Sequence, residues 1–205
     1  MTTENLFRIA AIAIFLAGAF ISTYYRRKAD RETGEKISSR AEGLPIMIAL
    51  RVAGLSLWLA VFAYLLNPAW VSWARVGLPL WMRWLGLGLG LLADLFSYWV
   101  FSNLGNNVSP TVATRTSHQL VTSGPYRWMR HPLYSMGMIA YIGFALLSAN
   151  WFIGLMAIIV FMILIIRVAQ EEAHLIEKFG NDYRNYMKRT GAFLPRIHFQ
   201  AEGKE

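Results

Sequence analysis

The stretch from residue 132 to residue 168, PLYSMGMIAYIGFALLSANWFIGLMAIIVFMILIIRV, decides the fold of this chain. It holds two apolar runs, 132–148 and 151–168, and each is long enough to cross or nearly cross a bilayer at about 1.5 Å per helical residue. Only Ala149 and Asn150 separate the runs, which predicts an antiparallel helical hairpin. The two outer ends of this hairpin must therefore lie on the same side of the membrane.

The rest of the chain is also too apolar for an ordinary soluble domain. Hydrophobic residues make up 56% of it, charged residues make up 16%, and the mean hydropathy is +0.37. Three further apolar runs, 6–25, 44–66 and 78–101, precede the hairpin. We therefore expect an all-α integral membrane protein with about five transmembrane helices. Residues 1–205 should form a single domain, with three spans in 1–101 and a long loop, the hairpin and an interfacial segment in 102–205.

Basic residues are distributed unevenly between the connections that join these spans. Six Lys and Arg fall in 26–43, three in 102–131 and seven from residue 167 onward, all on one side of the predicted membrane. The opposite side holds only Arg8, at the start of the first span, and Arg75 in 67–77. By the positive-inside rule, the N-terminus is expected outside, and the C-terminus and any site beside it are expected in the cytoplasm.

Composition excludes several other functions. The chain contains no cysteine, which excludes disulfides, thiolate metal sites and cysteine nucleophiles. Its net charge of +8 is accounted for by membrane orientation, so we expect no nucleic-acid partner. His118 and His131 could suggest metal ligands, but no other donors stand at a matching spacing. We therefore expect no metal.

The connection before the hairpin carries the densest polar motif, HQLVTSGPYRWMRHPLY at 118–134. The whole connection, 102–131, is thirty residues long, and connections of this length are uncommon in compact proteins. Its content of Gly, Pro, Tyr, Arg and His favours an ordered functional loop. Pro132 suits the first turn of a helix and pushes His131 out of helical geometry. Arg130 and His131 would then lie at a helix N-terminus, where free N–H groups and the positive end of the helix dipole favour binding of a carboxylate or phosphate. The alternative is that Arg127 and Arg130 only contact lipid headgroups.

The last apolar run continues into a polar stripe that consists of Arg167, Glu171, His174 and Lys178. Their spacing of four, three and four residues places them on one face of a helix that extends beyond the membrane. Arg167 and Glu171 could form a simple i,i+4 ion pair. However, Arg167 ends an unbroken apolar run, where a charge is costly and usually functional.

Other features of the spans have structural interpretations. Arg51 and Asp94 lie at matching depth, roughly 10 Å from the cytoplasmic end, and we expect an ion pair between spans two and three. Gly86 and Gly90 in LGLGLGL are interpreted as close helix packing, because no strand precedes them to make a nucleotide-binding loop. After Gly180 the mixture of Tyr, Met, Phe, Arg and Lys predicts an interfacial helix that could also cap a pocket.

These motifs together resemble the isoprenylcysteine carboxyl methyltransferase family, integral membrane enzymes related to phospholipid methyltransferases. The resemblance covers roughly residues 104–195 and has many elements in the family's order. In the loop and hairpin they are His118, Leu120 with Val121, Gly124 to Arg127, and Arg130 to Tyr134. After the hairpin they are Arg167, Glu171, Glu172, Phe179, Gly180, Tyr183 and Tyr186. One departure is Val108, where the family often has tryptophan.

The resemblance implies an enzyme that transfers a methyl group from S-adenosylmethionine to a lipidic acceptor from the bilayer. It assigns catalytic roles to Arg167, which would hold an acceptor carboxylate, and to Glu171, which would fix that guanidinium. The implied cofactor-binding residues are His118, Leu120, Val121, Gly124, Tyr126, Arg130, His131, Pro132, Tyr134 and Glu172. The donor's carboxylate would suit the helix N-terminus near His131, and its sulfonium would suit the Tyr126 or Tyr134 ring.

Other functions stay open at this point. Within enzymes, the acceptor could be a phospholipid or another lipid methylated on nitrogen or oxygen, and a membrane sterol reductase would need a nicotinamide site instead. A noncatalytic lipid-binding protein or a small transporter is the alternative of another class. A transporter typically shows two repeated halves with interrupted helices, and the sequence shows no such repeat.

Overall fold

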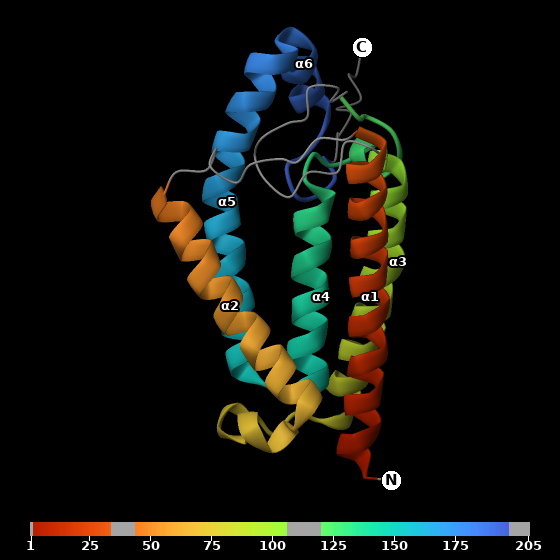
Figure 1. Cartoon of the computed structure of the whole chain (residues 1–205), viewed down its shortest axis with the longest axis vertical. Helices are drawn as coiled ribbons and strands as arrows, with labels where there is room; N and C mark the ends of the chain where they lie inside the picture. The colour runs from red at the N-terminus through yellow and green to blue at the C-terminus, as the bar shows by residue number, and fades with distance from the viewer. Residues whose placement is uncertain (1, 34–43, 106–119, 197–205) are drawn as a thin grey trace, which may run out of the picture.

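The computed structural model describes residues 2–33, 44–105 and 120–196, and within these ranges the protein is helical. The elements in chain order are α1 (Thr3–Thr33), α2 (Leu44–Leu66), the 3-10 segment η2 (Pro68–Ala74), α3 (Leu80–Leu104), the 3-10 turn η4 (Gly124–Arg127), α4 (Pro132–Ser148), α5 (Trp151–Phe179) and α6 (Asn181–Arg189). Figure 1 shows a bundle of long helices with α6 and the C-terminal segment at one end and the N-terminus at the other. The predicted all-α fold is confirmed.

The predicted spans all form helices. Four of them, α1, α2, α3 and α5, are long and apolar enough to cross a membrane, whereas α4 is an apolar helix of only 17 residues. α1 and α5 continue past the predicted ends of their apolar runs, because the polar residues that follow are good helix formers. α5 ends where Gly180 adopts a positive φ of 55°, and α6 is the helix predicted beyond that point.

The turn between α4 and α5 closes the predicted hairpin. Ala149 adopts the left-handed conformation with a φ of 50°, which ends α4. The Asn150 side chain then accepts a hydrogen bond from the Ile153 N–H at 3.0 Å and caps the start of α5. The antiparallel hairpin is therefore confirmed, and both of its outer ends reach the α6 end of the bundle (Figure 1).

The hairpin organises the other helices. α1 and α3 lie on one side of α4, and α2 packs on α5 on the other side (Figure 1). α3 and α4 come close at Gly86, where an added Cβ would lie 2.6 Å from the Gly143 carbonyl oxygen. Gly90 instead makes room for Ile14 of α1. The predicted role of Gly86 and Gly90 in helix packing is confirmed, with a different partner helix for each glycine.

The predicted ion pair between Arg51 and Asp94 is wrong. Arg51 lies exposed on α2, whereas Asp94 lies on α3 against Gly18 of α1. The position of a residue within its span predicts its depth in the membrane, but it does not predict which helices are neighbours. Because α2 packs mainly against α5, Arg51 does not lie on a helix that neighbours α3.

A different buried charge holds the opposite end of the bundle together. Arg83 of α3 is 6% exposed and binds both carboxylate oxygens of Glu4 on α1, at 3.0 and 3.1 Å. Its Nε donates to the Leu147 carbonyl at 2.9 Å, and its guanidinium stands 4.2 Å from the centre of the Phe7 ring. The Tyr64 hydroxyl of α2 also donates to Glu4, so this cluster ties four helices to one another.

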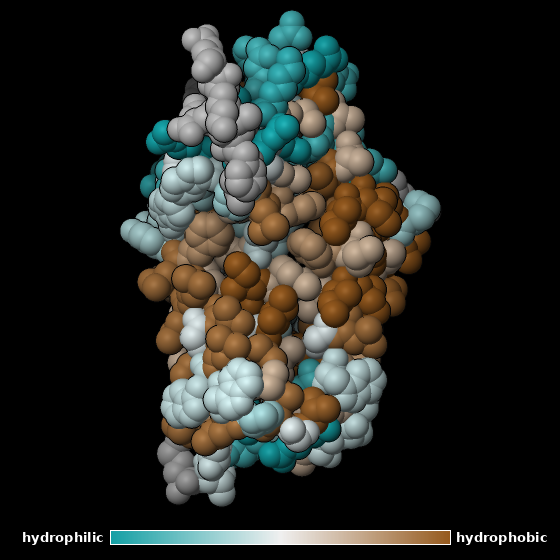
Figure 2. Space-filling view, turned by 180° about the vertical axis from the view of Figure 1, so that it is seen from behind, coloured by the Kyte–Doolittle hydropathy of each residue, from teal (hydrophilic) through white to brown (hydrophobic). Residues whose placement is uncertain are grey.

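The surface is that of a membrane-spanning protein. Figure 2 shows an apolar band across the middle of one face of the bundle, with more hydrophilic residues towards both ends. Exposed aromatic residues gather near both borders of this band, as they do at membrane–water interfaces. Those nearer the N-terminus are Trp70, Trp73, Trp81, Trp84 and Trp151, and those nearer α6 are Tyr24, Tyr98, Trp99 and Trp128. The chain is therefore an integral, multi-pass membrane protein.

Candidate active site

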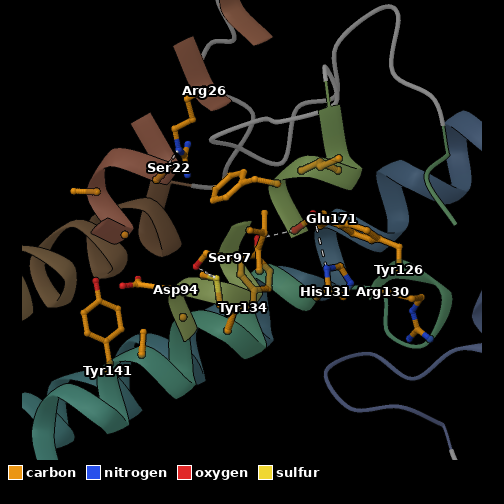
Figure 3. A pocket seen from close by; sticks show the side chains of 18 of the residues that line it. Ser22, Arg26, Asp94, Ser97, Tyr126, Arg130, His131, Tyr134, Tyr141 and Glu171 are labelled. Carbon is orange, nitrogen blue, oxygen red and sulfur yellow. Dashed lines mark hydrogen bonds and ion pairs between the residues drawn. The ribbon is translucent and has the colours of Figure 1, made fainter. Parts of the chain in front are cut away.

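A cavity of about 620 Å³ extends from the α6 end into the bundle between α1, α3, α4 and α5 (Figure 3). Its lining is polar towards α6 and apolar towards the middle of the membrane. The polar lining residues include Ser22, Arg26, Tyr126, Arg130, His131, Tyr134, Arg167, Glu171, Tyr183 and Tyr186. The apolar ones deeper in the bundle include Ile14, Phe15, Trp58, Val61, Ala140 and Phe144.

The loop before the hairpin is anchored on α3 and α6. Gly124 has a positive φ of 56°, and an added Cβ there would collide with the Asn103 side chain of α3. Tyr126 follows in the η4 turn and is 8% exposed. Its carbonyl accepts a hydrogen bond of 2.6 Å from the Tyr186 hydroxyl of α6. The GPYR motif is therefore a tight turn that places the Tyr126 ring in the cavity wall.

The C-terminal segment crosses the first turn of α4. The Arg130 and His131 backbone N–H groups donate to the carbonyls of Gly191 and Ala192, each at 2.9 Å. The Ser135 hydroxyl donates to the Phe193 carbonyl at 2.6 Å. These two N–H groups, which precede α4, are therefore not available to a ligand, and binding of an anion at this helix N-terminus stays a prediction.

Glu172 joins the start of α4 to α5. Its Oε1 accepts a 2.7 Å bond from Arg130 Nε and lies 3.0 Å from His131 Nε2. The Arg130 side chain is 11% exposed, and it also donates to the Thr190 carbonyl at 2.5 Å. A lipid headgroup is thus not the partner of Arg130, which instead fixes the C-terminal end of α6 against the hairpin.

Glu171 lies one residue earlier and faces the cavity. Its Oε2 accepts a 2.8 Å hydrogen bond from the Tyr134 hydroxyl, and its Oε1 lies 4.0 Å from His131 Nδ1. The His131 and Tyr134 rings stack, with centroids 5.6 Å apart and planes 6° apart. Arg167, one turn earlier on α5, is 9% exposed and also lines the cavity. A carboxylate and a guanidinium are therefore presented by consecutive turns of one helix.

Tyr183 of α6 offers a hydrogen bond to a ligand. It is 2% exposed, and within the described part of the chain its hydroxyl has no hydrogen-bond partner. Burial raises the pKa of Tyr183 well above its usual range, so the phenol stays protonated at physiological pH. A buried donor without a partner in the wall of a cavity is an unusual arrangement unless a ligand completes it.

Comparison with known proteins relates the part of the chain that forms this site to membrane methyltransferases. The phospholipid methyltransferase family model matches residues 81–182, about half of the chain. Protein-S-isoprenylcysteine O-methyltransferase of Mus musculus is 38% identical over 96 residues, which cover 45% of this chain and 34% of that protein. The region matched by the family model contains both the loop motif at 118–134 and the three residues Arg167, Glu171 and Glu172. The chain is thus similar in sequence to two related groups of membrane methyltransferases, the phospholipid methyltransferases and the protein-S-isoprenylcysteine O-methyltransferases.

Another curated protein that is similar to this chain has a different name. Nickel-cobalt-cadmium resistance protein NccN of Alcaligenes xylosoxydans xylosoxydans is 30% identical over 86 residues, 42% of this chain and 40% of that protein. The matches thus span less than half the length of these curated relatives. The solved structure of the eukaryotic intramembrane Ras methyltransferase ICMT covers 92% of this chain and 68% of its own, with a TM-score of 0.54 and 21% identity. That likeness shows the fold.

The structure brings most of the predicted methyltransferase site together. Eight predicted residues line the cavity: Leu120, Val121, Tyr126, Arg130, His131, Tyr134, Arg167 and Glu171. Gly124, Pro132 and Glu172 lie behind this lining and shape it. His118 and Val108 lie outside the described residues. His174 and Lys178, the rest of the polar stripe, are exposed and belong to the surface of the extended helix.

The contribution of the first three spans was missed from the sequence. Gly18, Ser22 and Arg26 of α1 and Asp94 of α3 all line the cavity, and Arg26 Nε donates to the Ser22 hydroxyl at 3.2 Å. The available signal was the four-residue spacing of Gly18, Ser22 and Arg26, which marks one helix face. Nothing in the sequence indicates that this face meets the hairpin.

Proposed function

We propose that the chain transfers a methyl group from S-adenosylmethionine to a lipidic acceptor, with carboxyl O-methylation of an isoprenylcysteine-like substrate as its reaction. The observation that carries this proposal is the continuity of the cavity. It joins the polar groups at the α6 end to an apolar channel that runs along α4 from Tyr134 to Phe144, about 15 Å by helical rise. A substrate with a polar head and a long apolar tail fits such a space.

The residues near α6 fit the methyl donor. When bound, S-adenosylmethionine supplies an electrophilic methyl group on a positively charged sulfur. The Tyr126 and Tyr134 rings line the cavity and favour a cation over their faces. The buried Tyr183 hydroxyl donates to a polar group of the same ligand. Because the N–H groups of Arg130 and His131 are occupied, these two residues contribute to the donor site only through their side chains.

The acceptor's reactive group is placed by α5. A carboxylate is already a nucleophile, so it needs orientation and charge balance but no general base. Arg167 holds that carboxylate through paired hydrogen bonds. Glu171, fixed by the Tyr134 hydroxyl, sets the position of the Arg167 guanidinium one turn away. The buried setting strengthens these interactions because water is excluded from them.

The acceptor reaches this point from the bilayer. Trp58 of α2 and Ala19 of α1 line the cavity and are exposed, and α1 and α2 contact each other over only a short stretch. This favours lateral entry between α1 and α2. The excess of Lys and Arg in the connections at the α6 end supports a cytoplasmic site and an external N-terminus. Labelling of single introduced cysteines with an impermeant maleimide tests this orientation, because the chain has no native cysteine.

A second candidate is N-methylation of a phospholipid amine, which the name of the matching family model favours. An amine must lose a proton before it attacks, and Glu171 is the carboxylate that faces the cavity. Transfer of radiolabelled methyl to a prenylcysteine analogue or to phosphatidylethanolamine decides between the two acceptors.

The donor is tested first and directly. Purified protein in detergent is titrated by calorimetry with S-adenosylmethionine and with S-adenosylhomocysteine. We expect saturable binding of both compounds. Binding of neither would refute a methyltransferase function and would favour a noncatalytic lipid-binding protein.

A further inference from the structure

One carboxylate interrupts the apolar part of the cavity. Asp94 projects from α3 into the space between α1 and α4, and Figure 3 shows it beside Tyr141, well away from the Glu171 and His131 cluster. Gly18 of α1 leaves the room that Asp94 occupies, since an added Cβ at Gly18 would lie 2.8 Å from Asp94 Oδ1. The carboxylate is therefore accommodated by a neighbouring helix without being paired by it.

Asp94 has no protein partner in the described ranges, 2–33, 44–105 and 120–196. No hydrogen bond or ion pair reaches its oxygens, and Arg51, the cation expected there, lies exposed on α2. Ten residues separate Asp94 from Leu104, the last residue of α3, which places it about 15 Å below that end of the helix. An ionisable side chain at this depth is costly and is usually retained for a ligand or a transported ion.

The surroundings of Asp94 say which ligand it suits. Between Tyr134, beside Glu171, and Tyr141, beside Asp94, α4 rises about 10 Å. Beyond Asp94 the cavity is lined by buried apolar side chains, among them Ile14, Val61 and Phe144. A tail of pure hydrocarbon would strip water from the carboxylate and give it no hydrogen bond in return.

We propose that Asp94 is a specificity site for a hydrogen-bond donor within the lipid acceptor. The acceptor carries a hydroxyl or a protonated amine about 10 Å from the atom that receives the methyl group, followed by a short apolar end. The shared chemistry is an N–H or O–H that donates to the Asp94 carboxylate. This inference rests on the proposed lipid-methylating function and narrows its substrate class.

The test measures acceptor affinity, so that it does not depend on turnover. Three prenylcysteine analogues of equal length are titrated by calorimetry into protein saturated with S-adenosylhomocysteine. One has a hydrocarbon tail, one has a hydroxyl about 10 Å from the carboxylate, and one has an amine at that position. We expect the wild-type protein to bind the better of the two polar analogues at least about tenfold more tightly than the hydrocarbon analogue, which is the effect of one hydrogen bond to a charged group.

Substitutions at Asp94 distinguish a hydroxyl from an amine as the lipid group that donates the hydrogen bond. Asp94→Leu should bind the hydrocarbon analogue best. Asp94→Asn should keep a preference for the hydroxyl if the natural donor is a hydroxyl, and should lose the preference for the amine if it is an amine. Gly18→Ala, which crowds Asp94 Oδ1, should weaken the preference, whereas Gly54→Ala, where an added Cβ meets nothing within 4 Å, should not.

Two results would overturn the proposal. The first is a wild-type protein that binds the hydrocarbon analogue as well as either polar one. The second is a large loss of thermal stability in both Asp94→Asn and Asp94→Leu, which would make Asp94 a structural residue. Failure of S-adenosylhomocysteine to bind would instead refute the methyltransferase function itself, so the two failures are distinguishable.

Discussion

Replacement of Gly86 by alanine tests the contact that holds the cavity wall together. α3 and α4 form that wall, and at Gly86 their backbones approach too closely for a side chain. An added Cβ would lie 2.6 Å from the Gly143 carbonyl oxygen and 2.9 Å from Leu146 Cβ. Backbone atoms cannot rotate away as a flexible side chain can, so the two helices must separate by nearly 1 Å to restore ordinary contact.

The magnitude follows from two opposing effects. Alanine in place of glycine in a helix stabilises it by roughly 1 kcal/mol. Overpacking of a close contact costs about 1–3 kcal/mol. Gly88, two residues away on the same helix, is the matched control, because an added Cβ there meets nothing within 4 Å. The helix-propensity gain is the same in both variants and cancels in their comparison, so we expect Gly86→Ala to be less stable than Gly88→Ala by about 1–3 kcal/mol.

The assay is thermal unfolding of both variants in the same detergent. At about 2–4 °C per kcal/mol for a chain of this size, Gly86→Ala should melt at least about 2 °C below Gly88→Ala. Bound S-adenosylhomocysteine should raise the melting temperature of Gly86→Ala, because a ligand that binds only the folded state stabilises that state. Equal melting temperatures for the two variants would refute the close α3–α4 contact, and with it the shape of the cavity wall.

Three further predictions concern the site itself. Arg167→Ala should lose methyl transfer while it keeps donor binding by calorimetry, and normal turnover would remove Arg167 from its role. Glu172→Gln should lower stability by about 1–3 kcal/mol and weaken donor binding, because Arg130 loses its charged partner at 2.7 Å. A Glu172→Gln protein that melts like the wild type would contradict that structural role. Tyr183→Phe should keep its melting temperature, since the hydroxyl has no partner in the described chain, but should bind the donor up to about tenfold more weakly. Unchanged donor affinity would exclude Tyr183 from the donor site.

The hairpin was predictable because its signal is local. Two apolar runs joined by Ala149 and Asn150 have one compact arrangement, and the structure has it. That turn also brings the loop motif and the Arg167–Glu172 stripe to one end of the bundle, so proximity of these two groups followed from the hairpin alone. Tyr134 and Glu171, 37 positions apart in the sequence, are joined by one hydrogen bond.

The packing of the first three helices was not predictable in the same way. Hydrophobic runs give the number and length of spans, but helix–helix contacts in a membrane depend on small residues and on the rotation of each helix. The error at Arg51 and Asp94 has this origin. The buried partner of Glu4 is Arg83, near the start of α3, and a charge so close to a span end is easily read as interfacial.

The adjacent carboxylates Glu171 and Glu172 show how one helix divides structural from chemical work. Successive residues of a helix point about 100° apart, so the two side chains leave α5 in different directions and approach opposite ring nitrogens of His131. Glu172 faces the first turn of α4, where Arg130 neutralises it and holds the C-terminal segment in place. Glu171 faces the cavity, where its hydrogen-bond donor is the neutral Tyr134 hydroxyl, so its charge stays available to balance a cationic donor or the Arg167 guanidinium. Exchange of the two roles would require a rotation of α5, which its packing on α2 and α4 opposes. The same packing holds Arg167, one turn before Glu171, in the cavity wall, so the proposed chemistry of this part of α5 depends on how the helix packs on its neighbours.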